Sequence, residues 1–263
     1  IIYRLGIENW LLVANASNRQ LVLTWLAKWK KHFKQIEIDD RTESTAMIAF
    51  QGPQATEITE KLSSEAFSEP RLFHCETNVI SGVSALCART GYTGEAGFEF
   101  IVEAKDANHL WQALLKAKAT PCGLGARDLL RLEAGLLLHG TDMDISTNPL
   151  EVNLGRFLSS DKGEFCGSKA LESIEQKGTE RTLVAFKLLE RGIPRHDYNI
   201  LSGESVIGRV TSGTYSPTLD RSIGLGYVAS AYAAIGTHFT IDIRGRFIDS
   251  EVVRLPFYSR KRH

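Results

Sequence analysis

The sequence predicts an α+β protein, in which helices and strands occupy distinct regions of the chain. Two patterns support this prediction. Between Asn18 and Phe33 apolar residues recur at helical spacing, with strand-like segments on either side. After Gly178 the pattern changes to short alternating segments separated by turn residues. At 263 residues the chain can bury a substantial core, and more than one domain is expected.

The first forty residues predict two strands, a helix and a third strand. Residues 1–5 and 10–14 alternate in polarity and should pair as a hairpin. The helix that follows carries one apolar stripe, and its two tryptophans are expected to anchor a core: Val22, Trp25, Leu26, Trp29 and Phe33. Residues 36–39 are expected to form the third strand.

The next region mixes strands and helices. Strands are predicted at 46–50, 71–74, 83–89 and 97–103, with helices opening after Gly52-Pro53, at 104–116 and around Arg127. A polar stretch at 159–176 should form a loop and a helix. The short segments at 183–186, 206–210, 223–227, 239–243 and 252–257 predict a small barrel or jelly roll.

Composition excludes some classes of function. Lys+Arg and Asp+Glu are equal at 31 each, so overall charge gives no reason to expect nucleic acid or an anionic membrane as a partner. Arg191, Arg195 and the basic tail at 260–263 form either a solvated surface or a contact for an acidic partner. The four cysteines show no CxxC pair and no metal-ligand spacing, so structural thiols and no metal site are expected. No apolar run reaches the ~18 residues of a membrane helix.

A glycine-rich loop is the most informative motif. Gly91, Gly94 and Gly97 recur at intervals of three and lead into the strand that carries Glu99. Such a loop allows close approach of the backbone to a ligand. About thirty residues later a helix begins with Arg127 in its first turn. A carboxylate and a guanidinium placed this way suit a flat polar heterocycle with an acidic tail. The spacing is not the GxGxxG of a dinucleotide fold, and no Walker lysine follows.

These motifs closely resemble the aminomethyltransferase (T-protein) family of the glycine cleavage system. The matching segments run in the family's order through the whole chain: 15–18, 51–53, 90–99, 123–135, 140–144, 148–150, 178–180 and 208–219. The resemblance implies three lobes. Residues 1–40 with 149–177 would form a discontinuous ferredoxin-like lobe, 41–148 the remainder of the folate-binding lobe, and 178–263 a C-terminal β-barrel or jelly-roll-like lobe. The pocket of such proteins lies where the lobes meet.

The resemblance also implies a function. Tetrahydrofolate would be the co-substrate and the lipoylated H-protein the partner. An aminomethyl group carried by that protein would yield ammonia and 5,10-methylenetetrahydrofolate. No nucleic acid or membrane partner is expected. The location would be the cytoplasm of a bacterium or the mitochondrial matrix of a eukaryote, and the cytoplasm is preferred.

Five residues match positions that contact folate in the family. Glu99 would accept hydrogen bonds from the pterin ring, and Arg127 and Tyr92 would pack against the folate. Asn15 would line the pocket, with a helix cap as its alternative role. Arg260 would reach the folate region from a tail in which Ser259 departs from the family pattern. Arg131 is expected to be structural.

The family's catalytic aspartate has no counterpart in this chain. Family members carry roughly a hundred residues before the position of Ile1, and an acidic pair directly ahead of it supplies that aspartate. The catalytic group is therefore expected upstream of Ile1. Three alternatives stay open: a folate-dependent domain like those of sarcosine or dimethylglycine dehydrogenases, a folate-binding iron–sulfur assembly paralogue, and an inactive binding-only fragment.

Overall fold

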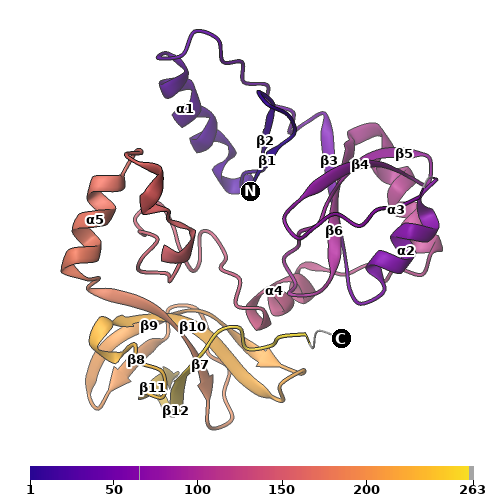
Figure 1. Cartoon of the computed structure of the whole chain (residues 1–263). Coiled ribbons are helices and arrows are strands. Elements are labelled where there is room, and N and C mark those ends of the chain that lie inside the picture. The colour runs from indigo at the N-terminus through magenta and orange to yellow at the C-terminus, as the bar shows by residue number, and fades with distance from the viewer. Residues whose placement is uncertain (65, 261–263) are drawn as a thin grey trace. The chain divides into compact units, whose positions relative to one another are not determined.

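The computed structural model describes residues 1–64 and 66–260, and its mixture of helices and sheets confirms the α+β fold class (Figure 1). The chain forms two compact units. One comprises Ile1–Gly91 with Glu95–Cys122, and the other Tyr92–Gly94 with Gly123–His263. The lobe boundaries at residues 40, 148 and 177 stay a prediction.

The first unit is centred on an antiparallel sheet in the order β3-β6-β5-β4. These strands span Thr45–Gln51 (β3), Cys75–Ile80 (β4), Val83–Ala88 (β5) and Gly97–Glu103 (β6), and the helices α2 (Ala55–Leu62), η2 (Ala104–Asp106) and α3 (Ala107–Lys116) complete this part. Phe98 and Phe100 of β6 are fully buried in one apolar cluster with Leu110 of α3. Because side chains alternate along a strand, Glu99 faces away from this cluster.

The N-terminal elements form the predicted hairpin and helix, but apart from Tyr3 their apolar residues are not buried. Strands β1 (Ile2–Arg4) and β2 (Trp10–Leu12) pair antiparallel, and η1 (Ala16–Asn18) leads into α1 (Arg19–Lys30). Helix α1 contains no buried residue, and Trp25 and Trp29 are 48% and 39% exposed. The expectation that the two tryptophans anchor a core is therefore wrong for this chain. Periodicity predicts an apolar face but cannot say what covers it.

Two predicted strands are absent from the described residues. Residues 71–74 form a turn, in which the backbone NH of His74 donates to the carbonyl of Arg71 at 2.9 Å, and β4 begins only at Cys75. Residues 36–39 are irregular, and Ile36 is 47% exposed. At 71–74 the chain turns, with Phe73 at a positive φ of 64°, although Phe73 and His74 still exchange backbone hydrogen bonds with Arg89, directly after β5.

The second unit joins helices to a closed barrel. Helix α4 (Leu124–Glu133) comes first, followed by η3 (Gly155–Phe157), η4 (Ser160–Lys162) and α5 (Ser168–Lys177). The barrel has the strand order β10-β7-β12-β11-β8-β9 (Figure 1, orange to yellow). Its strands are β7 (Arg181–Leu188), β8 (Asn199–Ser202), β9 (Ser205–Ser216), β10 (Arg221–Ala229), β11 (His238–Ile243) and β12 (Arg246–Val253), with η5 (Ser230–Tyr232) after β10. This confirms the predicted β-barrel.

Helix α4 is packed against the barrel. Leu132 belongs to the same buried cluster as Leu183 of β7 and Ile223 and Leu225 of β10. The first turn of α4 stays at the surface, where Arg127 is exposed. The helix therefore has one end fixed in the core and the other available to a ligand.

Candidate functional site

Glu99 is held by a short chain of polar contacts within the first unit. Thr90 donates a hydrogen bond from Oγ1 to Oε2 of Glu99, and the hydroxyl of buried Tyr3 lies 3.3 Å from the same Thr90 oxygen. Burial raises the pKa of Tyr3, and the charge of Glu99 adds to this rise. Among the described residues no hydrogen bond to the other oxygen of Glu99, Oε1, is found. One carboxylate oxygen is thus fixed by the protein and the other is available.

Two glycines of the loop, Gly91 and Gly97, pack closely against β3. Gln51 donates from Nε2 to the carbonyls of Thr90 (3.1 Å) and Phe98 (3.2 Å), so it ties both ends of the loop to β3. A Cβ on Gly91 would lie 1.7 Å from Oε1 of Gln51, and one on Gly97 would lie 2.3 Å from the carbonyl oxygen of Phe50. At these two positions the close approach is therefore to β3, rather than to a ligand as the sequence suggested.

Tyr92 and Arg127 form one surface within the second unit. The guanidinium carbon of Arg127 lies 4.6 Å from the centroid of the Tyr92 ring, and the Tyr92 hydroxyl donates to the carbonyl of Leu137 at 2.5 Å. Burial raises the pKa of Tyr92. The pair presents a flat, cationic surface, and a guanidinium over an aromatic face is stabilised by the quadrupole of the ring.

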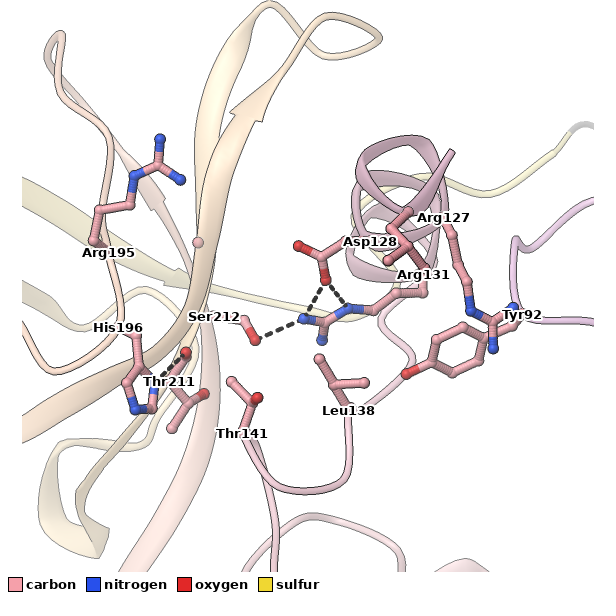
Figure 2. Close-up of a pocket in the computed structure, with 12 residues that line it drawn as sticks. Tyr92, Arg127, Asp128, Arg131, Leu138, Thr141, Arg195, His196, Thr211 and Ser212 are labelled. Carbon is pink, nitrogen blue, oxygen red and sulfur yellow. Dashed lines mark hydrogen bonds and ion pairs between the residues drawn. The ribbon is translucent and has the colours of Figure 1, made fainter. Parts of the chain in front are cut away.

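This surface borders a pocket of about 410 Å³ that lies wholly within the second unit. Helix α4 contributes Arg127, Asp128 and Arg131, while Arg195 and His196 line it from the loop between β7 and β8 (Figure 2). In Figure 2 the loop residues and the Arg127–Tyr92 pair lie on opposite sides of the pocket. Its walls therefore combine an aromatic ring with several cations.

A buried ion pair at this pocket joins α4 to the segment that follows it. Arg131 is 2% and Asp142 0% exposed, and their closest N–O distance is 2.5 Å. Arg131 also donates to Asp128 and, at 2.8 Å, to the hydroxyl of Ser212 on β9. Burial alone would lower the pKa of Arg131, but the carboxylates of Asp142 and Asp128 outweigh it and raise the pKa. The expected structural role of Arg131 fits this arrangement.

Asp142 is the centre of this network. Besides Arg131, it accepts hydrogen bonds from the backbone NH of Leu138 (2.9 Å) and from the hydroxyls of Thr211 and Ser212 (2.6 Å each). The residue next to Leu138, Leu137, accepts the Tyr92 hydroxyl. Asp142 therefore links β9, α4 and the segment that holds Tyr92.

Comparison with known proteins identifies the family. Residues 1–162 match the GCVT N-terminal domain, and residues 181–259 match the glycine cleavage T-protein C-terminal barrel domain. The chain belongs to the glycine cleavage T-protein family. It is thus an enzyme of the aminomethyltransferase family.

Individual members of the T-protein family resemble the chain along nearly its whole length. An aminomethyltransferase from Halothermothrix orenii is 42% identical over 98% of this chain and 72% of its own length. One from Thermosynechococcus vestitus is 44% identical over 95% of this chain and 68% of its own. The crystal structure of glycine cleavage system aminomethyltransferase T from Bartonella henselae superimposes with a TM-score of 0.83 at 33% identity, covering 95% of this chain and 68% of that chain.

The other two residues inferred from the T-protein resemblance are not among those that line this pocket. Asn15 is exposed in the first unit and makes no side-chain cap, so the alternative role as a helix cap is wrong. Arg260 is half-buried beyond β12 in the second unit. Glu99 lies in the first unit and Arg127 in the second. That all five residues serve one folate stays a prediction.

Several residues of the site were not assigned a role from the sequence. Asp142, Thr211 and Ser212 lie inside segments that match the T-protein family, but nothing in a linear pattern shows that they converge. In the sequence Arg195 is only one of several basic residues. Pairing and burial, which arise in the folded chain, distinguish these residues from ordinary polar ones.

The described residues offer neither a metal cluster nor a membrane-spanning helix. They contain no group of three His, Cys, Asp or Glu side chains placed to hold a metal ion. None of their helices is long and apolar enough to cross a membrane.

Proposed function

We propose that this chain transfers an aminomethyl group to tetrahydrofolate in glycine cleavage. The donor is the aminomethyl thioether on the lipoyl-lysine of the H-protein. The products are 5,10-methylenetetrahydrofolate, ammonia and the free lipoyl thiol, and the protons on N5 and N10 of the folate go to the ammonia and the thiol. The match to both T-protein domains, with relatives named aminomethyltransferase, carries this proposal. It also favours the transferase over the open alternatives.

Glu99 suits the donor edge of a pterin ring. That edge carries an amino group next to a ring NH, and the carboxylate can accept from both, because the oxygen held by Thr90 keeps a second lone pair. Thr90 holds one oxygen of Glu99 and fixes the orientation of the side chain. The Glu99 carboxylate is thus already ordered before the ligand binds, so binding loses less side-chain entropy.

The Arg127–Tyr92 surface suits the aromatic part of the folate. A flat ring can pack on the exposed side of a guanidinium that already lies over Tyr92. The folate supplies the nucleophilic nitrogen that takes the methylene carbon. The residues of this chain would hold the ligand in one orientation, which raises the effective concentration of the reacting atoms.

The remaining assignments follow the family pattern. We place Asn15 in the pocket wall and Arg260 near the folate, and we assign the catalytic aspartate to a position upstream of Ile1. The three lobes would be 1–40 with 149–177, 41–148 and 178–263. Lipoylated H-protein is the proposed partner. Since the relatives compared here are bacterial, we prefer the cytoplasm as the location.

Titration of tetrahydrofolate into the chain tests this proposal, followed by assay with aminomethylated H-protein. Saturable binding that Glu99→Gln weakens is expected, because the amide replaces one acceptor by a donor. A flat titration of the folded wild-type chain would contradict the folate assignment. Binding without turnover would agree with a catalytic aspartate outside this chain, whereas wild-type turnover would place the catalytic group within residues 1–263.

A further inference from the structure

The hydroxyl of Tyr3 begins a hydrogen-bonded chain that leads to Glu99. Tyr3 of β1 is 3% exposed, and its hydroxyl oxygen lies 3.3 Å from Oγ1 of Thr90, which donates to Oε2 of Glu99. Among residues 1–64 and 66–260, Thr90 is the one hydrogen-bond partner found for the Tyr3 hydroxyl. This hydroxyl depends on Thr90, because a buried hydroxyl without a partner costs free energy.

The donors of this chain all point towards Glu99. A carboxylate only accepts hydrogen bonds, so the single hydroxyl proton of Thr90 is used on Glu99. Thr90 can then only accept from Tyr3, and the Tyr3 hydroxyl must be the donor. Burial raises the pKa of Tyr3, so the phenol stays protonated and able to donate. The rotation of the Thr90 hydroxyl is therefore fixed from both sides.

The backbone of Thr90 is held as firmly as its hydroxyl. Its NH donates to the carbonyl of Ala88 at 2.9 Å, and its carbonyl accepts from Nε2 of Gln51 at 3.1 Å. Thr90 is 6% exposed, so water has little access to compete for its hydroxyl. Since both backbone and hydroxyl are fixed, Thr90 determines where the carboxylate of Glu99 lies.

The carboxylate of Glu99 has no second support of this kind. Within the described part of the chain it forms no ion pair, and Thr90 is the only side chain that donates a hydrogen bond to it. The terminal torsion of a glutamate is soft, so a half-buried carboxylate on one hydroxyl contact rotates once that contact loosens. The orientation of Glu99 thus depends on the Thr90 hydroxyl, and that hydroxyl depends on Tyr3.

We propose that Tyr3 is a positioning residue for folate recognition, which acts through Thr90 to fix the orientation of Glu99. This inference rests on the proposed function. The role requires no contact between Tyr3 and the ligand: Tyr3 holds Thr90 as a donor, and Thr90 leaves Oε1 of Glu99 free for the pterin edge. Aligned hydrogen bonds polarise one another, so Thr90 holds the carboxylate more strongly than an isolated hydroxyl would.

Two ligands and a small set of variants test this role by titration calorimetry. Tetrahydrofolate carries the 2-amino group, whereas its 2-desamino-2-methyl analogue presents only the ring NH to Glu99. The variants are Tyr3→Phe, Thr90→Val and Thr90→Ser, each alone and combined with Glu99→Ala. Thr59→Val is the matched control, because Thr59 is a fully buried residue of the same unit whose hydroxyl donates to the carbonyl of Ala55 at 2.7 Å. Thermal melting checks that each variant is folded.

For Tyr3→Phe we expect affinity for tetrahydrofolate to fall about three- to tenfold, as for one lost neutral hydrogen bond. Thr90→Val should lose at least as much, and Thr90→Ser should bind like wild type because it keeps the hydroxyl. The losses should be smaller for the analogue and absent in the Glu99→Ala background, because the effect passes through the carboxylate. Thr59→Val should bind both ligands normally, whatever its melting temperature.

Two results would overturn the positioning role. One is a folded Tyr3→Phe variant that binds tetrahydrofolate as wild type does. The other is a loss that is equal for both ligands or persists in full in the Glu99→Ala background, since Tyr3 would then act by packing alone. If Tyr3→Phe does not fold, equal binding by Thr90→Val and Thr90→Ser overturns the role, because Tyr3 acts only through that hydroxyl. Wild-type protein that binds neither ligand would instead remove the proposed function itself, and the positioning role with it.

Discussion

Replacing Asp142 by alanine should destabilise the second unit more than any surface change in the same network. Asp142 is 0% exposed and accepts hydrogen bonds from Arg131, Leu138, Thr211 and Ser212. Removing one partner of a buried ion pair costs about 3–5 kcal/mol, because the other charge stays buried without compensation. Arg131 would keep its contacts with Asp128 and Ser212, so we expect the lower end, about 3 kcal/mol.

Asp128→Ala is the matched control for this prediction. Asp128 contacts the same guanidinium at 2.8 Å, but its side chain is 55% exposed. An exposed ion pair contributes about 0.2–1 kcal/mol. The two variants therefore remove a carboxylate from the same arginine, and they differ mainly in burial.

The measurement must report on the second unit. All four tryptophans, Trp10, Trp25, Trp29 and Trp111, lie in the first unit, so their fluorescence does not follow the barrel directly. Urea unfolding should therefore be monitored by hydrogen exchange of peptides from α4 and β9, which reports unfolding of the second unit. The tryptophan fluorescence transition serves as an internal reference for the first unit. Equal destabilisation by Asp142→Ala and Asp128→Ala, or less than about 1 kcal/mol for Asp142→Ala, would refute the reasoning from burial.

Three further predictions concern single side chains. Glu99→Ala should weaken tetrahydrofolate binding about ten- to a hundredfold in a chain that still folds, as for a lost charged hydrogen bond; an unaltered calorimetric titration would count against its role. Tyr92→Phe should destabilise the second unit by about 1 kcal/mol, because the Leu137 carbonyl loses its partner; a melting temperature equal to wild type contradicts this. Burial raises the pKa of Cys87 to about 12, from an ordinary value of 9.0. The folded state therefore keeps this thiol protonated, so its contribution to stability is intact below pH 9 and is lost as pH rises towards 12. Under native conditions at pH 8, a thiol reagent should modify the exposed Cys122 and Cys166 rapidly and Cys87 only on unfolding.

The sequence by itself determined the class of fold, the family and most elements. Local patterns were sufficient for the hairpin, the Arg127 helix and the barrel, because alternation and helical periodicity follow from which face of an element is apolar. They failed at residues 36–39, which are irregular, and at 71–74, where the chain turns at Phe73 with a positive φ. The prediction that Trp25 and Trp29 are buried also failed, because an apolar stripe predicts an apolar helix face but does not predict that another element covers that face.

Only the tertiary structure decided how the site is built. Glu99, Arg127 and Tyr92 were chosen from motifs, but their support by Thr90 and Leu137 was not visible in the sequence. The buried pair of Arg131 and Asp142 also emerged only in three dimensions. A charge acquires its role from which groups share its surroundings and how much water they exclude, and a linear sequence records neither.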